Sequence, residues 1–404
     1  AINLRADIEA GKIKKVAVIG GGYIGLEVAE NLALQNIKVS VIEMAPHILT
    51  GFDKEFAEYA EDYLIDHGIM VFTETKLESI EGTERVEKIQ TSKKVMEVDA
   101  VIMSVGIRPN TEFLADTGIE LLPNKTIKVN EYFQTNDENI YAAGDCVSVK
   151  NILTDKLVWS PMGSSANIEG RIIAQNLSGK KIKFKGVLGT AVAKLPGLNV
   201  GRTGLTETAA REMGFDVVSV VTVEDDKAHY YAGASNFIIK LIADRKTLKI
   251  LGVQVFGTGA VDKVVDVIVT AMSMRGTLHD IEDLDLAYAP PFSTAIHPIV
   301  HTVNVLFNKI NGVLESITPA EYLDGNGMGY TVFDSCTVPT IEGAPYLELT
   351  EVNGKLPGYD LDDRLLLVCN RGRKAYLIQN RLKYYGYTNT RVLEGGVTFN
   401  KVKI

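Results

Sequence analysis

Cys369 stands between an apolar run and a loop that carries three cations. The sequence over residues 365–375 is LLLVCNRGRKA, so Asn-Arg-Gly-Arg-Lys follows the thiol. Positive charge and backbone N–H groups at a helix start favour the nucleophilic thiolate over the thiol. We therefore interpret Cys369 as a reactive sulfur. The alternative is a buried structural cysteine beside a solvated cluster of cations.

A second candidate site is the glycine pattern Gly20-x-Gly22-x-x-Gly25 in KVAVIGGGYIGLEV. In a dinucleotide-binding turn the first glycine permits the tight turn, the second lets backbone approach a pyrophosphate, and the third lets helix and sheet pack closely. Glu43 ends the next strand-like run, where a carboxylate would bind the ribose hydroxyls and repel a 2′-phosphate. The pattern predicts NADH binding in preference to NADPH, and a glycine turn that merely packs is the alternative.

The elements that must position these residues follow from hydrophobic periodicity. Strand-like runs at 15–20, 38–43 and 68–74 alternate with helical patterns near 31–35 and 53–67, which predicts a doubly wound parallel sheet. Antiparallel-like strands at 217–224, 236–244 and 249–257, with two helices, predict an α+β lobe. The run 365–368 predicts a buried strand, and 375–385 predicts a helix, so the Cys369 loop would open onto a helix N-terminus.

Composition limits the class of protein. The 404 residues carry a net charge of −9, which disfavours a nucleic-acid partner. No apolar run approaches a membrane span, and residues 1–15 lack a signal-peptide pattern, so we expect a soluble cytoplasmic protein with no membrane partner. The cysteines Cys146, Cys336 and Cys369 form no C-x-x-C pair, which argues against a metal site or a dithiol centre.

The segments GGGYIGLE, GIRPN, TNDENIYAAGDC, GRTGLTE and DLAYAPPFS together resemble the FAD-dependent pyridine nucleotide-disulfide oxidoreductases, in the coenzyme A-disulfide reductase and NADH oxidase branch. The resemblance implies that Asp145 contacts the flavin ribityl chain, that Tyr23 gates the nicotinamide and that Glu27 frames its pocket. The same motifs place Ile24, Gly106 and Gly144 among the cofactor-binding residues. For isolated residues, a turn acid, a core tyrosine and a surface charge are the alternatives.

The resemblance also implies a homodimer whose partner completes each active site. It places Tyr288 where this branch has a tyrosine from the opposite subunit, and Tyr230 near bound coenzyme A. Their hydroxyls could protonate a departing thiolate or hydrogen-bond a peroxide. Packing against apolar neighbours is the alternative for both. His297 stands where related enzymes have an acid/base histidine, although we expect a core or surface histidine there.

The last eighty or so residues resemble a rhodanese, with Asp334 in the early strand VFDSC and 369–374 as the active loop. The segment after VFDSC departs from the rhodanese pattern, and we expect Cys336 to be structural. An FAD-binding glycine fingerprint and a flavin-facing cysteine do not occur in this sequence. We expect that missing N-terminal half elsewhere on the native polypeptide.

These inferences predict an α/β protein with four domains. They are a Rossmann-type NAD(P)H-binding domain (1–107), the C-terminal part of an FAD domain (108–179), an α+β dimerisation domain (180–323) and a rhodanese-like domain (324–404). The expected function is NADH-dependent, FAD-mediated reduction of a coenzyme A disulfide, persulfide or polysulfide. The alternatives are an NADH oxidase that reduces oxygen and a non-catalytic nucleotide-binding or sulfur-carrier module.

Overall fold

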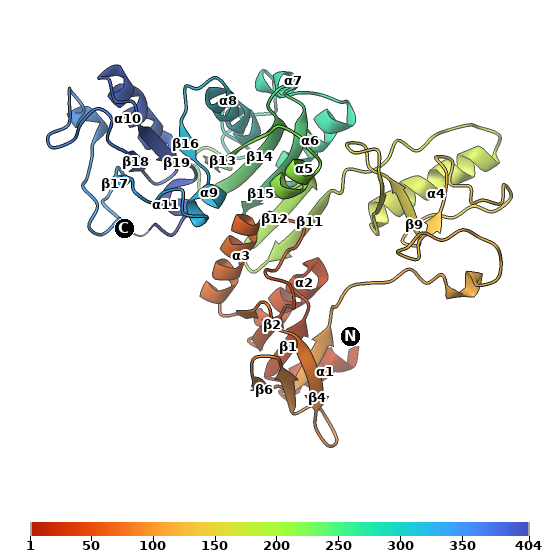
Figure 1. The fold of residues 1–404 in the computed structure, drawn as a ribbon. Helices are drawn as coiled ribbons and strands as arrows, with labels where there is room; N and C mark the ends of the chain where they lie inside the picture. The colour runs from red at the N-terminus through yellow and green to blue at the C-terminus, as the bar shows by residue number, and fades with distance from the viewer. Residues whose placement is uncertain (1, 403–404) are drawn as a thin grey trace. The chain divides into compact units, whose positions relative to one another are not determined.

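The computed structural model describes residues 2–402, and its contacts divide the chain into two compact units. One unit comprises Ala1–Ser104 with Val192–Ile404, and the other comprises Val105–Ala191. Figure 1 shows the elements of each unit as a ribbon. No helix among the described residues has the length and apolar character needed to cross a bilayer.

The chain begins with helix α1 (Ile2–Glu9) and a parallel four-stranded sheet in the order β3-β2-β1-β7. Its strands and their helices are β1 (Lys15–Ile19), α2 (Tyr23–Ala33), β2 (Lys38–Ile42), α3 (Lys54–Asp66), β3 (Met70–Phe72) and β7 (Ala100–Met103). In β1 and β2 every residue after the first lysine is buried, as expected for strands covered on both faces. The predicted doubly wound parallel sheet is confirmed.

A small antiparallel sheet interrupts this unit and was not expected from the sequence. Its strands are β4 (Leu77–Glu81), β5 (Lys88–Thr91) and β6 (Val95–Glu97), in that order. The three strands are short and charged, and Ile89 is one of few residues that they bury fully. Their hydrophobic alternation is therefore too weak to be recognised in the sequence.

The unit Val105–Ala191 contains a three-stranded sheet in the order β10-β9-β8 and one long helix. Its elements are η1 (Glu112–Leu114), β8 (Ile127–Lys128), β9 (Val147–Lys150), β10 (Leu157–Trp159) and α4 (Gly163–Leu177). Phe133 and Ile172 pack with the buried residues of β9 to form its core. Gly144 and Asp145 lie in the long loop between β8 and β9, shortly before β9 begins.

The third sheet is the predicted antiparallel lobe, in the order β11-β12-β15-β14-β13. Its elements are β11 (Ala191–Leu195), β12 (Leu198–Gly204), α5 (Glu207–Glu212), β13 (Val217–Asp225), β14 (Asn236–Asp244), β15 (Ile250–Gly257), α6 (Val261–Ser273), α7 (His279–Glu282) and α8 (Pro298–Ile310). The β15 strand is buried along its whole length. Helix α6 packs on β12 and β15, and α8 packs on β13 and β14. The three strands and two main helices expected from the sequence are confirmed.

The C-terminal region has a parallel sheet in the order β16-β19-β18-β17. Its elements are β16 (Ser316–Ile317), α9 (Pro319–Leu323), β17 (Thr331–Asp334), η2 (Leu349–Glu351), β18 (Leu365–Val368), α10 (Arg373–Tyr384), β19 (Thr390–Leu393) and α11 (Gly396–Phe399). The strand and helix predicted on either side of Cys369 are confirmed. Because β16 pairs with β19, this sheet begins upstream of residue 324.

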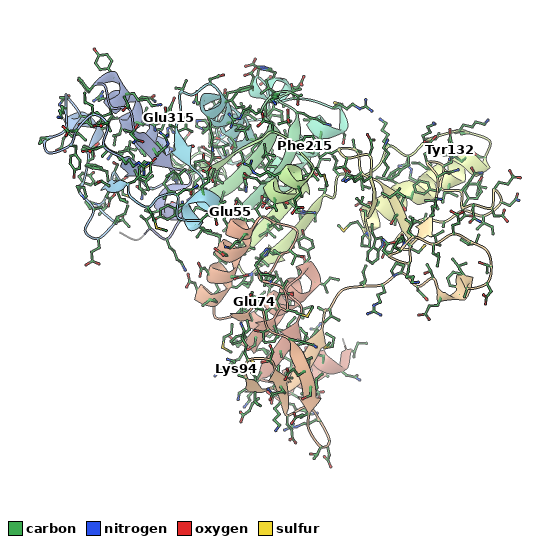
Figure 2. The ribbon with its side chains drawn as sticks, viewed as in Figure 1. Glu55, Glu74, Lys94, Tyr132, Phe215 and Glu315 are labelled. Carbon is green, nitrogen blue, oxygen red and sulfur yellow. The ribbon has the colours of Figure 1, made fainter. Side chains whose placement is uncertain are left out.

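A buried cluster of charged side chains joins α3, the helix between β2 and β3 of the first parallel sheet, to the antiparallel lobe. The Nζ atom of Lys240, on β14, lies 2.9 Å from Asp53 Oδ2, 2.5 Å from Glu55 Oε1 and 2.9 Å from Glu207 Oε2. Figure 2 labels Glu55 on the first turn of α3. Burial alone would lower the pKa of Lys240, but the three carboxylates outweigh burial and raise that pKa above its usual value. Loss of Lys240 would leave buried acids without a counter-charge, so this cluster fixes α3 on the lobe.

Candidate functional site

The glycine turn after β1 has the geometry that its sequence predicts. Gly20 adopts a φ of +109°, in the region that favours glycine. A Cβ atom on Gly25 would lie 2.1 Å from the Gly20 carbonyl oxygen, so only glycine allows α2 to pack this closely. A Cβ on Gly22 would have nothing within 4 Å, and no side chain caps α2 at this residue. Open space and uncapped helix amides are the features that a pyrophosphate requires.

Glu43 lies beside this turn. Its Oε2 accepts a 2.6 Å hydrogen bond from the Gly21 amide, and its Oε1 accepts a 2.7 Å bond from the Ala45 amide. Each carboxylate oxygen has a second lone pair, so the carboxylate can also accept a ribose hydroxyl. The Glu43 carboxylate, the uncapped amides of α2 and the space at Gly22 therefore fit an NAD(P)H molecule.

Three further predicted residues lie on the first helical turns of α2. Tyr23 is half-buried, and its ring packs edge-on against Phe52 with centroids 6.4 Å apart. Burial raises the pKa of Tyr23, and the nearby Arg202 guanidinium offsets part of that increase. Ile24 is 64% exposed, and the Glu27 carboxylate accepts a 3.4 Å hydrogen bond from the Lys194 amide. The structure thus brings Tyr23 and Glu27 to the surface that faces the antiparallel lobe.

The unit Val105–Ala191 contains the residues predicted to contact the flavin. Gly144 has a φ of +82°, and Asp145 follows it with an exposed side chain. The indole nitrogen of Trp159 donates a 2.8 Å hydrogen bond to the Asp145 carbonyl. Gly106, with a φ of +94°, lies in the loop after β7. An exposed carboxylate on a fixed turn is chemically suited to a ribityl hydroxyl, so Asp145 fits this part of an FAD site.

Glu169 is a residue of this unit that sequence reasoning missed. It is 1% exposed, and its Oε2 accepts a 2.6 Å hydrogen bond from the Gly144 amide. Burial raises the pKa of Glu169, the Gly144 amide lowers it, and Asp145 raises it further. Glu169 lies on the buried face of α4 with Ser165 and Ile172. A carboxylate at helical spacing among buried positions is the sequence signal that could have identified it.

Cys369 directly follows β18 and begins the short loop that leads to the N-terminus of α10. The thiol is 3% exposed, and its Sγ accepts hydrogen bonds from the amides of Gly372 at 3.2 Å and Ala375 at 3.4 Å. Gly372 caps the helix with a φ of +89°, which turns the loop back over the sulfur. Backbone amides that converge on one sulfur stabilise negative charge there, so the geometry suits a thiolate or a persulfide anion.

The three cations of the loop do not act together, contrary to the interpretation that all of them hold the sulfur. Arg371 Nη1 lies 2.7 Å from Asp225 Oδ1, and Lys374 Nζ lies 2.5 Å from Glu348 Oε2. Arg373 has no carboxylate within ion-pair distance among residues 2–402. Because two cations are neutralised by neighbouring acids, the amides of the loop are the groups that directly contact the sulfur.

Asp334 ends β17, and Cys336 lies in the loop that follows. The Asp334 carboxylate accepts hydrogen bonds from the amides of Cys336, Thr340 and Ile341 at 2.8, 2.6 and 2.8 Å. Burial opposes the charge on Asp334, but these amides outweigh it and lower its pKa. Burial, together with the Asp334 carboxylate, raises the pKa of Cys336 to about 12. Cys336 therefore remains a protonated thiol at neutral pH.

The two predicted tyrosines occupy neighbouring segments of the antiparallel lobe. Tyr230 is 70% exposed and Tyr288 is 49% exposed. Their segments meet where the Ala228 amide donates a 3.3 Å hydrogen bond to the Pro290 carbonyl. The side chains are therefore available to a ligand or to a second subunit, and their catalytic role stays a prediction.

His297 is the N-cap of α8. It is 6% exposed, and its Nδ1 accepts a 3.3 Å hydrogen bond from the Ile299 amide. Burial, with a smaller contribution from Lys263, lowers the pKa of His297 to about 4. The imidazole is neutral at physiological pH and is engaged in capping, as expected for a core histidine. Within residues 2–402, no group of three His, Cys, Asp or Glu side chains is arranged to hold a metal ion.

Comparison with known families gives two matches. Residues 3–166 match the family described as pyridine nucleotide-disulphide oxidoreductase, and residues 191–299 match the dimerisation domain of the same family. The NAD(P)H coenzyme A polysulfide/persulfide reductase of Pyrococcus horikoshii is 37% identical over 308 residues, which are 76% of this chain and 68% of the relative. An NADH oxidase of Methanocaldococcus jannaschii is 37% identical over 72% of this chain and 65% of its own length.

Solved structures resemble nearly the whole chain. The NAD-dependent persulfide reductase from A. fulgidus matches with a TM-score of 0.91 and 33% identity, over 98% of this chain and 73% of that structure. The reduced Bacillus anthracis CoADR-RHD matches with a TM-score of 0.90 and 31% identity, over 98% of this chain and 72% of that structure. With its nucleotide turn, dimerisation lobe and sequence matches, the chain belongs to the pyridine nucleotide-disulphide oxidoreductases, a family of FAD-dependent NAD(P)H oxidoreductases.

Proposed function

We propose that this chain takes part in NADH-dependent, FAD-mediated reduction of a coenzyme A persulfide, polysulfide or disulfide, and that Cys369 handles sulfane sulfur for that reaction. The observation that carries the proposal is the pair of amides that donate hydrogen bonds to Cys369 Sγ at 3.2 and 3.4 Å. The same polypeptide contains the nucleotide turn. If sulfur is the electron acceptor, a reductase needs a group that holds anionic sulfur, and Cys369 on the same chain can be that group.

The proposed roles of the nucleotide-site residues follow from their geometry. Gly22 leaves room for the pyrophosphate, and the uncapped amides of α2 stabilise its charge. Glu43 accepts the ribose hydroxyls and disfavours a 2′-phosphate, so NADH is the proposed nucleotide. When bound, NADH and FAD supply the two-electron chemistry. The resemblance to the family adds that Tyr23 gates the nicotinamide, that Glu27 frames its pocket and that Asp145 holds the ribityl chain.

The proposed roles of Cys369, Tyr230 and Tyr288 concern sulfur. The Cys369 thiolate accepts a sulfur atom, and its loop amides stabilise the persulfide anion that results. Tyr230 and Tyr288 lie exposed on the lobe that matches a dimerisation domain, and we propose that they reach the site across a homodimer interface and protonate a departing thiolate. Relatives named persulfide reductase support the sulfur acceptor.

The C-terminal region is proposed to be a rhodanese-like domain. Its parallel sheet, the strand–loop–helix at Cys369 and the match of 98% of this chain to CoADR-RHD support the proposal. The division at residues 107, 179 and 323, and an N-terminal FAD-binding half on the native polypeptide, stay predictions.

The test is anaerobic NADH consumption by the full protein with coenzyme A persulfide, compared with oxygen uptake in its absence. We expect persulfide-dependent NADH consumption with release of sulfide and free coenzyme A. The second candidate is oxygen reduction, which the similarity to an NADH oxidase favours. Rapid oxygen uptake together with no response to persulfide would overturn the proposal in favour of that oxidase.

A further inference from the structure

The opening above Cys369 is lined by residues of two domains. A pocket of about 560 Å³ lies over the sulfur. It is lined by the loop 369–374 except Gly372, by Thr337, Leu377 and Thr398 of the C-terminal region, and by Asn236. Asn236 begins β14 of the dimerisation lobe, where it pairs with Asp225 at the end of β13. The C-terminal region therefore does not enclose its own reactive sulfur, because the β13–β14 hairpin supplies part of the wall.

Asp225 makes the direct contact between this hairpin and the loop. Its Oδ1 lies 2.7 Å from Arg371 Nη1, and the side chains of Asp225 and Arg371 are 26% and 37% exposed. Because both side chains are partly shielded, water and salt screen this ion pair less than they screen a fully exposed pair. Asp225 is also held on a nine-residue strand that pairs along its whole length with β14, so its carboxylate is a rigid anchor.

The three cations of the loop differ in whether a carboxylate neutralises them. Asp225 neutralises Arg371, and Glu348 neutralises Lys374 at 2.5 Å. Arg373 lines the same pocket and has no carboxylate within ion-pair distance in the part of the chain that the structure describes. An anion that enters the pocket would therefore meet one unneutralised guanidinium, next to the amides that hold Cys369 Sγ.

We propose that Asp225 is a positioning residue for sulfur transfer at Cys369. It holds Arg371 against the dimerisation lobe, which keeps the loop amides directed at the sulfur and leaves Arg373 as the cation that binds the anionic sulfur donor. This inference rests on the proposed sulfur-handling role of Cys369. It assigns part of that site to a different domain of the chain.

Thiosulfate is a suitable probe donor because its transfer step balances without an external oxidant or reductant. The Cys369 thiolate attacks the outer sulfur of thiosulfate, so a new S–S bond forms on Cys369 while the S–S bond of thiosulfate breaks. Sulfite leaves with the electron pair of the broken bond, and a persulfide anion remains on Cys369. Cyanide then removes the outer sulfur as thiocyanate and regenerates the thiolate.

The experiment measures thiocyanate formation by the full protein and its variants. We expect Asp225→Asn to lower kcat by about tenfold, because misplacement of a loop that aligns reacting atoms has effects of at least this order. Its KM for thiosulfate should fall or stay constant, because Arg371 becomes an additional free cation. Arg373→Gln should instead raise the KM by about tenfold, the effect of losing one charge-assisted contact of ~1.4 kcal/mol.

Three variants control for a merely structural effect. Asp216→Asn, which removes a carboxylate before the other end of β13, should leave kcat and KM unchanged. Asp225→Glu should retain most of the activity, and the exchange Asp225→Arg with Arg371→Asp should recover kcat relative to Asp225→Arg alone. NADH oxidation should be the same in all of these proteins.

Unchanged kcat in Asp225→Asn, or no recovery in the exchange variant, would overturn the positioning role. An equal loss in Asp216→Asn, or a parallel loss of NADH oxidation, would also overturn it, because either result indicates general destabilisation. The failure of the broader proposal is distinguishable from these. It would appear as wild-type thiocyanate formation that does not depend on Cys369.

Discussion

The nucleotide turn at 20–25 and the sulfur loop at 369–374 are built alike but direct their backbone amides at different targets. Each follows a buried parallel strand, opens onto a helix and uses a glycine with positive φ, at Gly20 (+109°) and Gly372 (+89°). In the first turn, Gly22 leaves open space in front of the helix amides. In the second, the amides of Gly372 and Ala375 donate to the sulfur of Cys369 itself.

The difference shows how one backbone device can bind either an external or an internal anion. A turn without a side chain at its centre leaves its amides to a ligand, whereas a cysteine at the strand end places an ionisable atom among them. The neighbouring acids differ as well. Glu43 accepts a hydrogen bond from the Gly21 amide of the nucleotide turn, while Asp225 and Glu348 neutralise cations of the sulfur loop.

The largest expected effect is a loss of sulfur transfer, at the sulfur loop, that leaves NADH oxidation intact. Cys369→Ser should lower sulfur transfer from thiosulfate at least about a thousandfold, because it removes the nucleophile. NADH oxidation should be spared. Thiocyanate formation and the anaerobic NADH assay, run on the same preparation, check both statements. Sulfur transfer that persists in this variant would contradict the role of Cys369.

The next effect tests the close approach of α2 to β1. Gly25→Ala places a Cβ 2.1 Å from the Gly20 carbonyl oxygen, so we expect a loss of about 1–3 kcal/mol in the free energy of unfolding, with NADH affinity lost as well. Gly22→Ala is the matched control, since its Cβ would meet nothing within 4 Å. It should keep the stability and weaken only NADH binding. Denaturant unfolding and nucleotide titration would reveal whether the two glycines differ in this way.

A smaller effect concerns the acid beside the nucleotide turn. Glu43→Gln should raise the KM for NADH about tenfold, or ~1.4 kcal/mol, and improve the relative use of NADPH. The reason is that a neutral amide bonds the ribose hydroxyls more weakly and no longer repels a 2′-phosphate. Glu97→Gln, at a side chain that is 81% exposed, is the control. An unaltered NADH-to-NADPH preference would argue against the proposed ribose contact.

The smallest effect tests the left-handed glycine of the sulfur loop. A Cβ on Gly372 would approach no atom closer than 3.7 Å, so Gly372→Ala should cost only the conformational strain of about 1 kcal/mol and slow sulfur transfer severalfold. Gly386→Ala carries the same strain, at a φ of +94°, beyond the C-terminal end of α10. If both variants slow sulfur transfer equally, the shape of the loop at Gly372 has no special importance.

Most of the fold could be predicted because long periodic runs specify their elements. The runs around 15–19, 38–42 and 365–368 became buried parallel strands, since continuous apolar sequence fits strands covered on both faces. The antiparallel sheet at 77–97 was missed because its short, half-exposed strands carry little alternation. Its strands pair with their neighbours in the sequence, so the weak alternation within each strand is what hid them.

The candidate sites were predicted less completely than the fold. The nucleotide turn was recognisable since its glycines and Glu43 lie close together in the sequence. The partners of the sulfur loop were not, because Asp225 is 146 residues from Arg371 along the chain. Three adjacent cations suggested a common electrostatic role, and two of them turned out to be paired with acids. Glu169 was likewise missed, because its place on the buried face of α4 is its only signal in the sequence.

The sequence by itself determined where the long buried strands, the helices beside them and the glycine turns form, because hydrophobic period and glycine placement act over a few neighbouring residues. Only the tertiary structure decided which charges remain unneutralised and which acid supports which turn. Electrostatic partners depend on distance in space, and the chain brings Asp225 to Arg371 and Lys240 to Asp53 from segments that carry no local sign of each other.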